Sequence, residues 1–194
     1  MNSLYQWQQY YCSNVDYFLR ADEDTLLVGS RFEYWLNKEF NAISSRFDQK
    51  VIFGHLLRNS PVLRNPNDRW YVSFEWYDKP TYPDYVGGPC YLMTSKAVKL
   101  ILEEAKNHKH MPIDDAFYTG IVADAAGIKV FDGSQYFGFA FTLSQWDHSC
   151  DKNGIPFLFS IVDEDGEYDD AHGGYTKALN IFKQYGSSTC STFS

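Results

Sequence analysis

Strand-like and helix-like segments alternate along this chain, and the alternation constrains its fold more than any other feature. Short apolar runs predict strands, and apolar residues three or four positions apart predict amphipathic helices. The predicted strands are 17–20, 50–57, 128–131 and 137–143, with a weaker candidate at 70–76. The predicted helices are 3–12, one opened by a capping box at Ser30 and Glu33, 98–105, 115–126 and 175–185. This order predicts an α/β sheet flanked by helices, whereas the Pro- and Gly-rich segment 77–89 predicts irregular structure.

The size and composition of the chain suit one globular domain. Its 194 residues are enough for a core of ordinary size, and hydrophobic residues make up 44%, which excludes a disordered chain. The formal net charge of −8 excludes the basic surface of a nucleic-acid-binding protein and a polybasic membrane patch. No apolar run is long enough to span a bilayer, and the first twelve residues do not resemble a signal peptide.

The chain contains four cysteines, Cys12, Cys90, Cys150 and Cys190. None of them belongs to a CxxC pair, which excludes a zinc ribbon. The even number allows two disulfides in three alternative pairings, and cysteine usage alone does not decide between compartments.

Three consecutive acidic residues, Asp22, Glu23 and Asp24, follow the predicted strand 17–20 in "YFLRADEDTLL". One interpretation is a solvated acidic turn. The other is a site for Mg²⁺ or Mn²⁺, because both cations prefer oxygen ligands and can in turn hold a diphosphate. Ligands of α/β sheets gather at the carboxyl ends of strands, and this position favours the cation site.

A second acidic pair, Asp114 and Asp115, opens the predicted helix of "MPIDDAFYTG". Either carboxylate is a suitable N-cap for that helix. Either is also suitable as a general base that the start of the helix directs into a cleft. The two interpretations do not exclude each other.

Aromatic residues crowd around a Gly-Gly pair between positions 70 and 88. They are Trp70, Trp76, Tyr77, Tyr82 and Tyr85, and the glycines are Gly87 and Gly88. An ordinary surface turn explains this segment. A platform for sugar rings also explains it, because aromatic faces stack on sugars and glycines let a ligand approach the backbone closely.

The acidic segment 163–174 does not have the spacing of an EF-hand. Counted from Asp163, Gly166 is fourth and Gly174 is twelfth, whereas the EF-hand loop needs Gly at position six and Glu at position twelve. Taken alone, His172 is most simply a surface residue.

The three motifs, taken in order, resemble the β-1,3-galactosyltransferase and β-1,3-N-acetylglucosaminyltransferase superfamily, with the fringe-type transferases as more distant relatives. "YFLRADEDTLL" is similar to the family's strand and DxD motif. "RWYVSFEWYDKPTYPDYVGGPCYLMTSKAV" resembles its acceptor-side segment, and "MPIDDAFYTGIVADAAGIKV" resembles its P-x-(E/D)-D helix. The resemblance covers roughly residues 2–150.

The resemblance implies a GT-A type nucleotide-sugar fold, a mixed sheet flanked by helices. The first strand–helix units of that fold are expected to be missing, because the chain opens in the middle of the domain. Residues 1–49 are then the DxD-bearing part, and residues 50–194 are the acceptor-side part with the catalytic Asp. The family transfers a hexose or N-acetylhexosamine from a UDP-sugar to a 3-hydroxyl of a glycan on protein or lipid, with inversion and with Mn²⁺. Its members are usually type II Golgi membrane proteins, whose anchor this sequence does not show.

The resemblance also assigns roles to individual residues. Asp22 and Asp24 match the ends of the DxD motif, and His172 is the expected third metal ligand. Asp115 matches the general base. The expected substrate-binding residues are Trp76, Tyr82, Tyr85, Gly87, Gly88 and Asp114. Two positions depart from the family pattern, because Glu23 replaces a common third Asp and Cys90 replaces a common Gly.

Two other functions fit parts of the sequence. A catalytically inactive fragment or carbohydrate-binding pseudoenzyme fits the expected absence of the first nucleotide-binding units. A glycoside hydrolase with two carboxylates fits less well, because its chemistry does not need a DxD motif at a strand end. UDP binding separates the transferase from the first alternative, and metal dependence separates it from the second.

Overall fold

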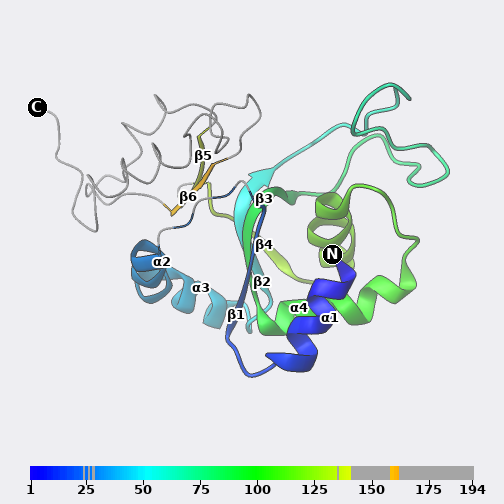
Figure 1. Ribbon diagram of the computed structural model, residues 1–194. Helices are drawn as coiled ribbons and strands as arrows, with labels where there is room; N and C mark the ends of the chain where they lie inside the picture. Colours follow the sequence, from blue (N-terminus) through cyan, green and yellow to red (C-terminus); the bar gives the residue numbers. More distant parts are fainter. Residues whose placement is uncertain (24, 26, 28, 135, 141–157, 162–194) are drawn as a thin grey trace, which may run out of the picture.

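The computed structural model describes residues 1–140 and 158–161, with the exception of residues 24, 26, 28 and 135 (Figure 1). Four strands form the main sheet in the order β1-β3-β2-β4, and two form a second sheet. The main strands are β1 (Tyr17–Ala21), β2 (Val51–Leu57), β3 (Tyr85–Thr94) and β4 (Lys129–Asp132). The second sheet pairs β5 (Phe137–Ala140) with β6 (Leu158–Ile161). The predicted helix 175–185 lies outside the described residues.

The main sheet is mixed, as expected. Strand β3 runs antiparallel to both β1 and β2, whereas β2 and β4 are parallel. The ladder between β2 and β3 is interrupted, because Gly54 pairs with Tyr91 and Leu56 pairs with Val86. One β2 residue, His55, therefore lies opposite the β3 residues 87–90, which we call the β3 bulge.

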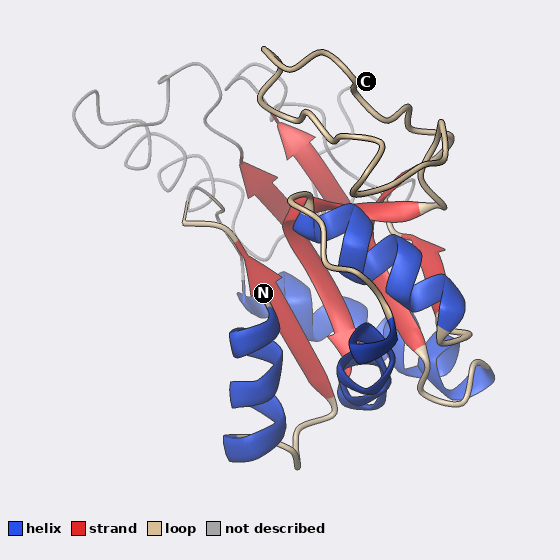
Figure 2. Cartoon of the chain, turned by 90° about the vertical axis from the view of Figure 1, so that its right-hand side faces the viewer, coloured by secondary structure: helices blue, strands red, loops and turns tan. Residues whose placement is uncertain are grey.

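Helices cover both faces of the main sheet, so that the domain has three layers (Figures 1 and 2). The helices are α1 (Asn2–Tyr11), α2 (Gly29–Trp35), η1 (Leu36–Phe40), α3 (Asn41–Arg46), α4 (Ser95–Glu104), η2 (Ala105–Asn107), η3 (Ala116–Val122) and α5 (Ala123–Ala125). One hydrophobic core lies between the sheet and the helices α1, α4 and η3, and the other lies under α2, η1 and α3.

Alternate residues of the central strands supply the two cores. Tyr91 and Met93 belong to the first core, and Cys90 and Leu92 belong to the second. This follows from the strand geometry, since successive side chains point to opposite faces of a sheet. The two central strands, β2 and β3, therefore read as nearly continuous apolar runs, but only β2 was predicted from the sequence.

Two expectations about the strands were wrong. Residues 70–76 form turns and irregular structure and not a strand, and β3 begins at Tyr85, inside the segment expected to be irregular. In the loop 58–84, the Arg64 side chain takes the place of a partner strand for three backbone carbonyls. It donates hydrogen bonds to the carbonyls of Val72, Tyr77 and Lys79 at 2.7–2.8 Å. The segment that begins at Tyr85 forms a strand despite its Pro and Gly residues, because it pairs with both β1 and β2. The irregular part of its pairing with β2 is the β3 bulge.

The helix ends match the sequence in part. Gly127, the expected C-cap, has a φ of 65°, a conformation that glycine adopts without strain. Ser30 lies inside α2, which begins at Gly29, so the expected capping box does not open that helix. The predicted helix 115–126 is present but consists mostly of the π-helix η3. Within the described part of the chain, no helix is both long and apolar enough to cross a membrane.

We predict that Thr94→Val lowers the free energy of unfolding by about 1–2 kcal/mol. The Thr94 hydroxyl accepts a hydrogen bond from the Ala97 amide at the start of α4 and donates one to the Gln49 carbonyl. Thr94→Ser keeps both bonds and is the matched control in urea denaturation. Equal unfolding midpoints for the two variants would show that the hydroxyl contributes no stability.

Candidate active site

The β3 bulge creates the space in which Asp115 lies. Gly88 is in this bulge, and a Cβ atom built on it would stand 2.4 Å from Oδ2 and 2.7 Å from Oδ1 of Asp115. The Gly88 backbone also hydrogen-bonds to the Asp115 carboxylate. Gly88 therefore accommodates the carboxylate and leaves no room there for a larger side chain, and Gly87 is buried beside it.

Asp115 stands at the start of η3, and its carboxylate makes no helix-capping hydrogen bond. The helix is instead tied to the sheet through Thr119, whose hydroxyl donates to the Asp115 carbonyl at 2.7 Å and accepts from the Val86 amide at 3.1 Å. These contacts fix the base of the Asp115 side chain against β3. Capping is therefore not what the Asp115 carboxylate does in this structure.

Burial raises the pKa of Asp115 from 3.8 to about 6. The charge of Arg20 lowers this pKa, the carboxylates of Asp22 and Asp114 raise it, and the Gly88 hydrogen bond lowers it. A carboxylate whose pKa lies near neutrality is suited to accepting a proton in catalysis, because it is ionised at pH 7 but still basic.

The end of β1 brings the acidic triplet to the same place. The Asp22 amide donates to the Pro89 carbonyl at 2.9 Å, and the Thr25 hydroxyl donates to the same carbonyl at 2.8 Å. The Asp22 carboxylate forms an ion pair with Arg20, with 2.6 Å between Nη2 and Oδ1. The structure thus places Asp22 and Asp115 beside one β3 bulge, although the two residues are 93 positions apart in the sequence.

The predicted metal site is described only in part. Asp24 and His172 lie outside the described residues, and Asp22 is the one expected ligand whose surroundings are known. Within the described ranges, no group of three or more His, Cys, Asp or Glu side chains is placed to hold a metal ion. The site for Mn²⁺ stays a prediction.

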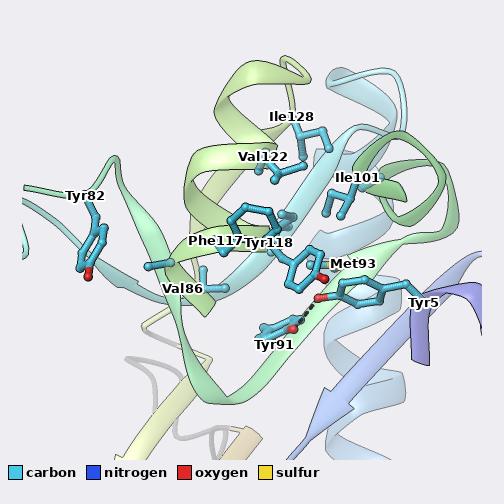
Figure 3. Close-up of a cluster of buried hydrophobic side chains, with 14 of the residues drawn as sticks. Tyr5, Tyr82, Val86, Tyr91, Met93, Ile101, Phe117, Tyr118, Val122 and Ile128 are labelled. Atoms are coloured by element: carbon cyan, nitrogen blue, oxygen red, sulfur yellow. Dashed lines mark hydrogen bonds between the residues drawn. The ribbon is translucent and has the colours of Figure 1, made fainter. Parts of the chain in front are cut away.

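The expected acceptor residues do not form a single platform. Tyr82 is only 7% exposed, and its ring stacks on Tyr77 at 5.4 Å and meets Tyr85 edge-on at 5.9 Å. Figure 3 shows it in the first core, at the end away from the Tyr5–Tyr91 pair. Burial thus removes Tyr82 from the predicted sugar platform, whereas Trp76 is 42% exposed.

Three further expected residues have clear surroundings. Tyr85 is partly buried and packs close to Gly120, where a Cβ would lie 3.0 Å from the Tyr85 Cβ. Asp114 lies 3.2 Å from Nε2 of His110 and 3.6 Å from the amino group of Met1. Cys90 is a free thiol in the second core, and burial raises its pKa to about 12.

Sequence reasoning missed Arg20, which pairs with the Asp22 carboxylate and interacts electrostatically with Asp115. It was interpreted as the last residue of an apolar strand. A cation two residues before an acidic triplet was the available signal, because a largely buried arginine needs a carboxylate partner. Cys12 is free in the structure, whereas Cys150 and Cys190 lie outside the described residues.

Comparison with known proteins finds several related glycosyltransferases. A human lactosylceramide 1,3-N-acetyl-β-D-glucosaminyltransferase is 28% identical over 126 residues, which cover 64% of this chain and 32% of the relative. A rat UDP-GlcNAc:βGal β-1,3-N-acetylglucosaminyltransferase 7 is 27% identical over 125 residues, covering 64% and 30%. The β-1,3-galactosyltransferase bre-2 of Caenorhabditis elegans is 29% identical over 150 residues, covering 73% and 33%.

These alignments span about a third of the length of the curated relatives. The family model described as Galactosyltransferase matches residues 1–133, a range that contains Arg20, Asp22, Gly88 and Asp115. This match covers more than half of the chain and includes both sides of the β3 bulge. The α/β fold, the mixed sheet and the family match agree, and the chain belongs to the galactosyltransferase family.

Proposed function

We propose that this chain carries an inverting glycosyltransferase site. A hexose or N-acetylhexosamine moves from a UDP-sugar to the 3-hydroxyl of a glycan acceptor on protein or lipid. The observation that carries the proposal is the Asp115 carboxylate, which has a pKa of about 6 and lies in the β3 bulge beside the acidic end of β1. The printed names of the relatives, which are β-1,3-transferases, support the same reaction.

In the proposed reaction, Asp115 accepts the proton of the acceptor's 3-hydroxyl. The hydroxyl oxygen then forms a bond to the anomeric carbon from the face opposite the nucleotide. The bond between that carbon and the phosphate oxygen breaks, and UDP leaves with the electron pair. Positioning by the protein contributes much of the rate, since well-oriented groups react far faster than free ones.

The proposed cofactor is Mn²⁺, held by Asp22, Asp24 and His172. Mn²⁺ at this site would neutralise the charge that develops on the departing diphosphate. The position of Asp22 supports this proposal, because its carboxylate lies at the end of β1 and near the proposed base Asp115.

For the acceptor, we propose contacts with the exposed face of Trp76 and with Tyr85, Gly87 and Asp114. Trp76 already has Lys109 5.3 Å from its ring centroid, so a sugar would use the remaining exposed surface. By family resemblance we also propose the Golgi lumen as the location and no role for nucleic acid.

Calorimetric titration of residues 1–194 with UDP and Mn²⁺ tests the proposal, followed by transfer assays with UDP-galactose and UDP-N-acetylglucosamine on β-galactoside acceptors. Mn²⁺-dependent UDP binding and transfer to the acceptor would support the proposed function. Glycan binding without UDP binding would instead identify a carbohydrate-binding pseudoenzyme. Hydrolysis of a glycoside without metal would identify a hydrolase.

We predict that Asp115→Asn reduces transfer by at least about 100-fold, because general base catalysis typically contributes 10²–10⁴-fold. UDP binding should remain close to that of the unsubstituted chain, since Asn has nearly the same shape as Asp. Initial rates and calorimetric affinities are the measurements. Turnover within a factor of two of the unsubstituted chain would contradict the base assignment.

The same variant should change how stability depends on pH. Because folding raises the pKa of Asp115 from 3.8 to about 6, the folded state favours the protonated form. The resulting stability is fully present below pH 3.8 and is lost as the pH rises through about 6. At pH 7.5 Asp115→Asn should therefore be more stable than the unsubstituted chain, by up to about 3 kcal/mol, and this advantage should shrink at pH 4. Urea denaturation at the two pH values measures it.

We predict that Gly88→Ala displaces the Asp115 carboxylate and reduces transfer by about 100-fold or more, because small misplacements of catalytic groups are costly. Gly29→Ala is the matched control, because a Cβ at Gly29 meets nothing within 4 Å. Rates of both variants are compared at equal folded fraction, determined by circular dichroism. Equal rates for the two variants would show that the close contact at Gly88 has no catalytic role.

We predict that Asp24→Ala removes the stabilisation of the protein by Mn²⁺ with UDP. A ligand that binds only the native state raises its apparent stability, so loss of a metal ligand removes the melting shift. Melting curves with and without 1,000 Kd of ligand should differ by about 4 kcal/mol of apparent stability in the unsubstituted chain. A full shift in the variant would place the metal elsewhere, for example on the acidic segment 163–174.

A further inference from the structure

Arg20 has no assigned role, yet it pairs with Asp22 in the candidate site and acts electrostatically on Asp115. Its side chain is only 16% exposed, and its Nη2 lies 2.6 Å from the Asp22 carboxylate. Its guanidinium carbon lies 5.6 Å from the centroid of the Tyr91 ring, the residue opposite it in the β1–β3 ladder. Its Nη1 is buried and has no hydrogen-bond partner among the residues that the structure describes. Buried charges and unpaired buried donors are costly, so such an arginine needs a reason.

The surface on which Arg20 rests is closely packed. Tyr91 is fully buried, and its hydroxyl is 2.6 Å from the hydroxyl of Tyr5 in α1 (Figure 3). Tyr5 in turn meets Phe18 and Tyr118 edge-on, at 5.6 and 5.2 Å. Tyr118 belongs to η3, the helix that begins beside Asp115. The packing under Arg20 therefore connects β1, β3, α1 and the helix that carries the proposed base.

The charges around Arg20 come from the two halves of the proposed reaction. Asp22 belongs to the acidic turn that is expected to hold the cation and the donor diphosphate. Asp115, the proposed base on the acceptor side, interacts electrostatically with Arg20 and with Asp22. Two carboxylates beside one bulge repel each other, and a cation paired with one of them offsets that repulsion.

We propose that Arg20 is a positioning residue that couples the Asp22 carboxylate of the donor side to the Asp115 carboxylate of the acceptor side. It holds Asp22 directly, rests on Tyr91, and balances the charge of Asp115, so that the two carboxylates keep one relative placement. The identity of the two sides rests on the proposed function, but the coupling of the three side chains does not.

The guanidinium group is important to this role. Arginine is planar, can stack on a ring and still donate to a carboxylate from its edge, whereas lysine has a compact point charge without that geometry. Arg20→Lys should therefore keep the charge but lose the fixed placement.

A double-substitution cycle in melting temperature at pH 7.5 tests the coupling without an activity assay. The four proteins are the unsubstituted chain, Arg20→Gln, Asp115→Asn and the double variant. Arg20→Gln should lower the melting temperature by roughly 5 °C or more, because it removes the cation that pairs with Asp22 and offsets the charge of the largely buried Asp115. In the Asp115→Asn background, Arg20→Gln should lower the melting temperature by less than about half of that amount, because the negative charge of Asp115 is already absent.

Arg46→Gln is the matched control for the loss of an arginine that contacts a ring. Arg46 is exposed in α3, and its guanidinium carbon lies 5.9 Å from the Phe47 ring centroid. Its effect should be small and equal in both backgrounds. If Arg20→Gln is equally destabilising in the unsubstituted chain and in the Asp115→Asn background, the coupling is absent and the proposal is wrong.

The reaction itself is tested with Arg20→Lys. We expect its kcat to fall by about tenfold or more, while its melting temperature stays within roughly 2 °C of the unsubstituted chain, since about 2–4 °C corresponds to 1 kcal/mol in a chain of this size. A kcat within twofold of the unsubstituted chain would overturn the positioning role. Failure of UDP binding in the unsubstituted chain would contradict the proposed function, and the melting cycle would still decide the coupling.

Discussion

The close contact between Gly88 and the Asp115 carboxylate is the constraint on which the rest of the site depends. The carboxylate occupies the volume that a Cβ atom at position 88 would fill. That contact requires the β3 bulge, in which residues 87–90 stand opposite one residue of β2. It also requires η3 to begin where Thr119 can bond both to Val86 and to the Asp115 carbonyl. Bulge, glycine and helix position thus form one structural unit, as is common for bulges beside active sites.

This unit places an ionisable group where ionisation is unfavourable. Burial raises the pKa of Asp115, and the neighbouring carboxylates raise it further, whereas Arg20 and the Gly88 backbone lower it. The opposing effects leave a group that is charged at neutral pH and still ready to take a proton. Proteins generally give up some stability at such sites. Here the two cores on either side of the sheet, with Tyr91 and Leu92 on opposite faces of β3, provide the rigid frame.

The sequence predicted most of the fold, because periodicity reports which residues face a core. It found β1, β2, β4, α1 and α4 within a few residues of their ends. The sequence did not predict β3, because the strand begins in a segment whose Pro and Gly residues locally favour a loop. Its strand conformation depends on pairing with residues that are distant in the sequence. The sequence prediction also failed at 70–76, where aromatic and β-branched residues favour a strand but Arg64 satisfies the loop carbonyls instead.

The candidate site divides in the same way. Asp22, Gly88 and Asp115 were predicted because residue type and motif order are written in the sequence, and Arg20 was not predicted because its proposed role depends on neighbours that only the structure shows. Tyr82 and Trp76 are both aromatic residues near the Gly-Gly pair and look equally suited to sugar binding in the sequence. In the structure, Tyr82 is 7% exposed and Trp76 is 42% exposed. Which aromatic ring meets a sugar depends on how the loop 58–84 folds over the first core, where Val62, Val72 and Tyr82 pack with Phe117 of η3. The segment that supplies the proposed acceptor surface is therefore anchored on the helix that presents the proposed base. The proposed acceptor binding and the proposed proton transfer would therefore depend on the same part of the core.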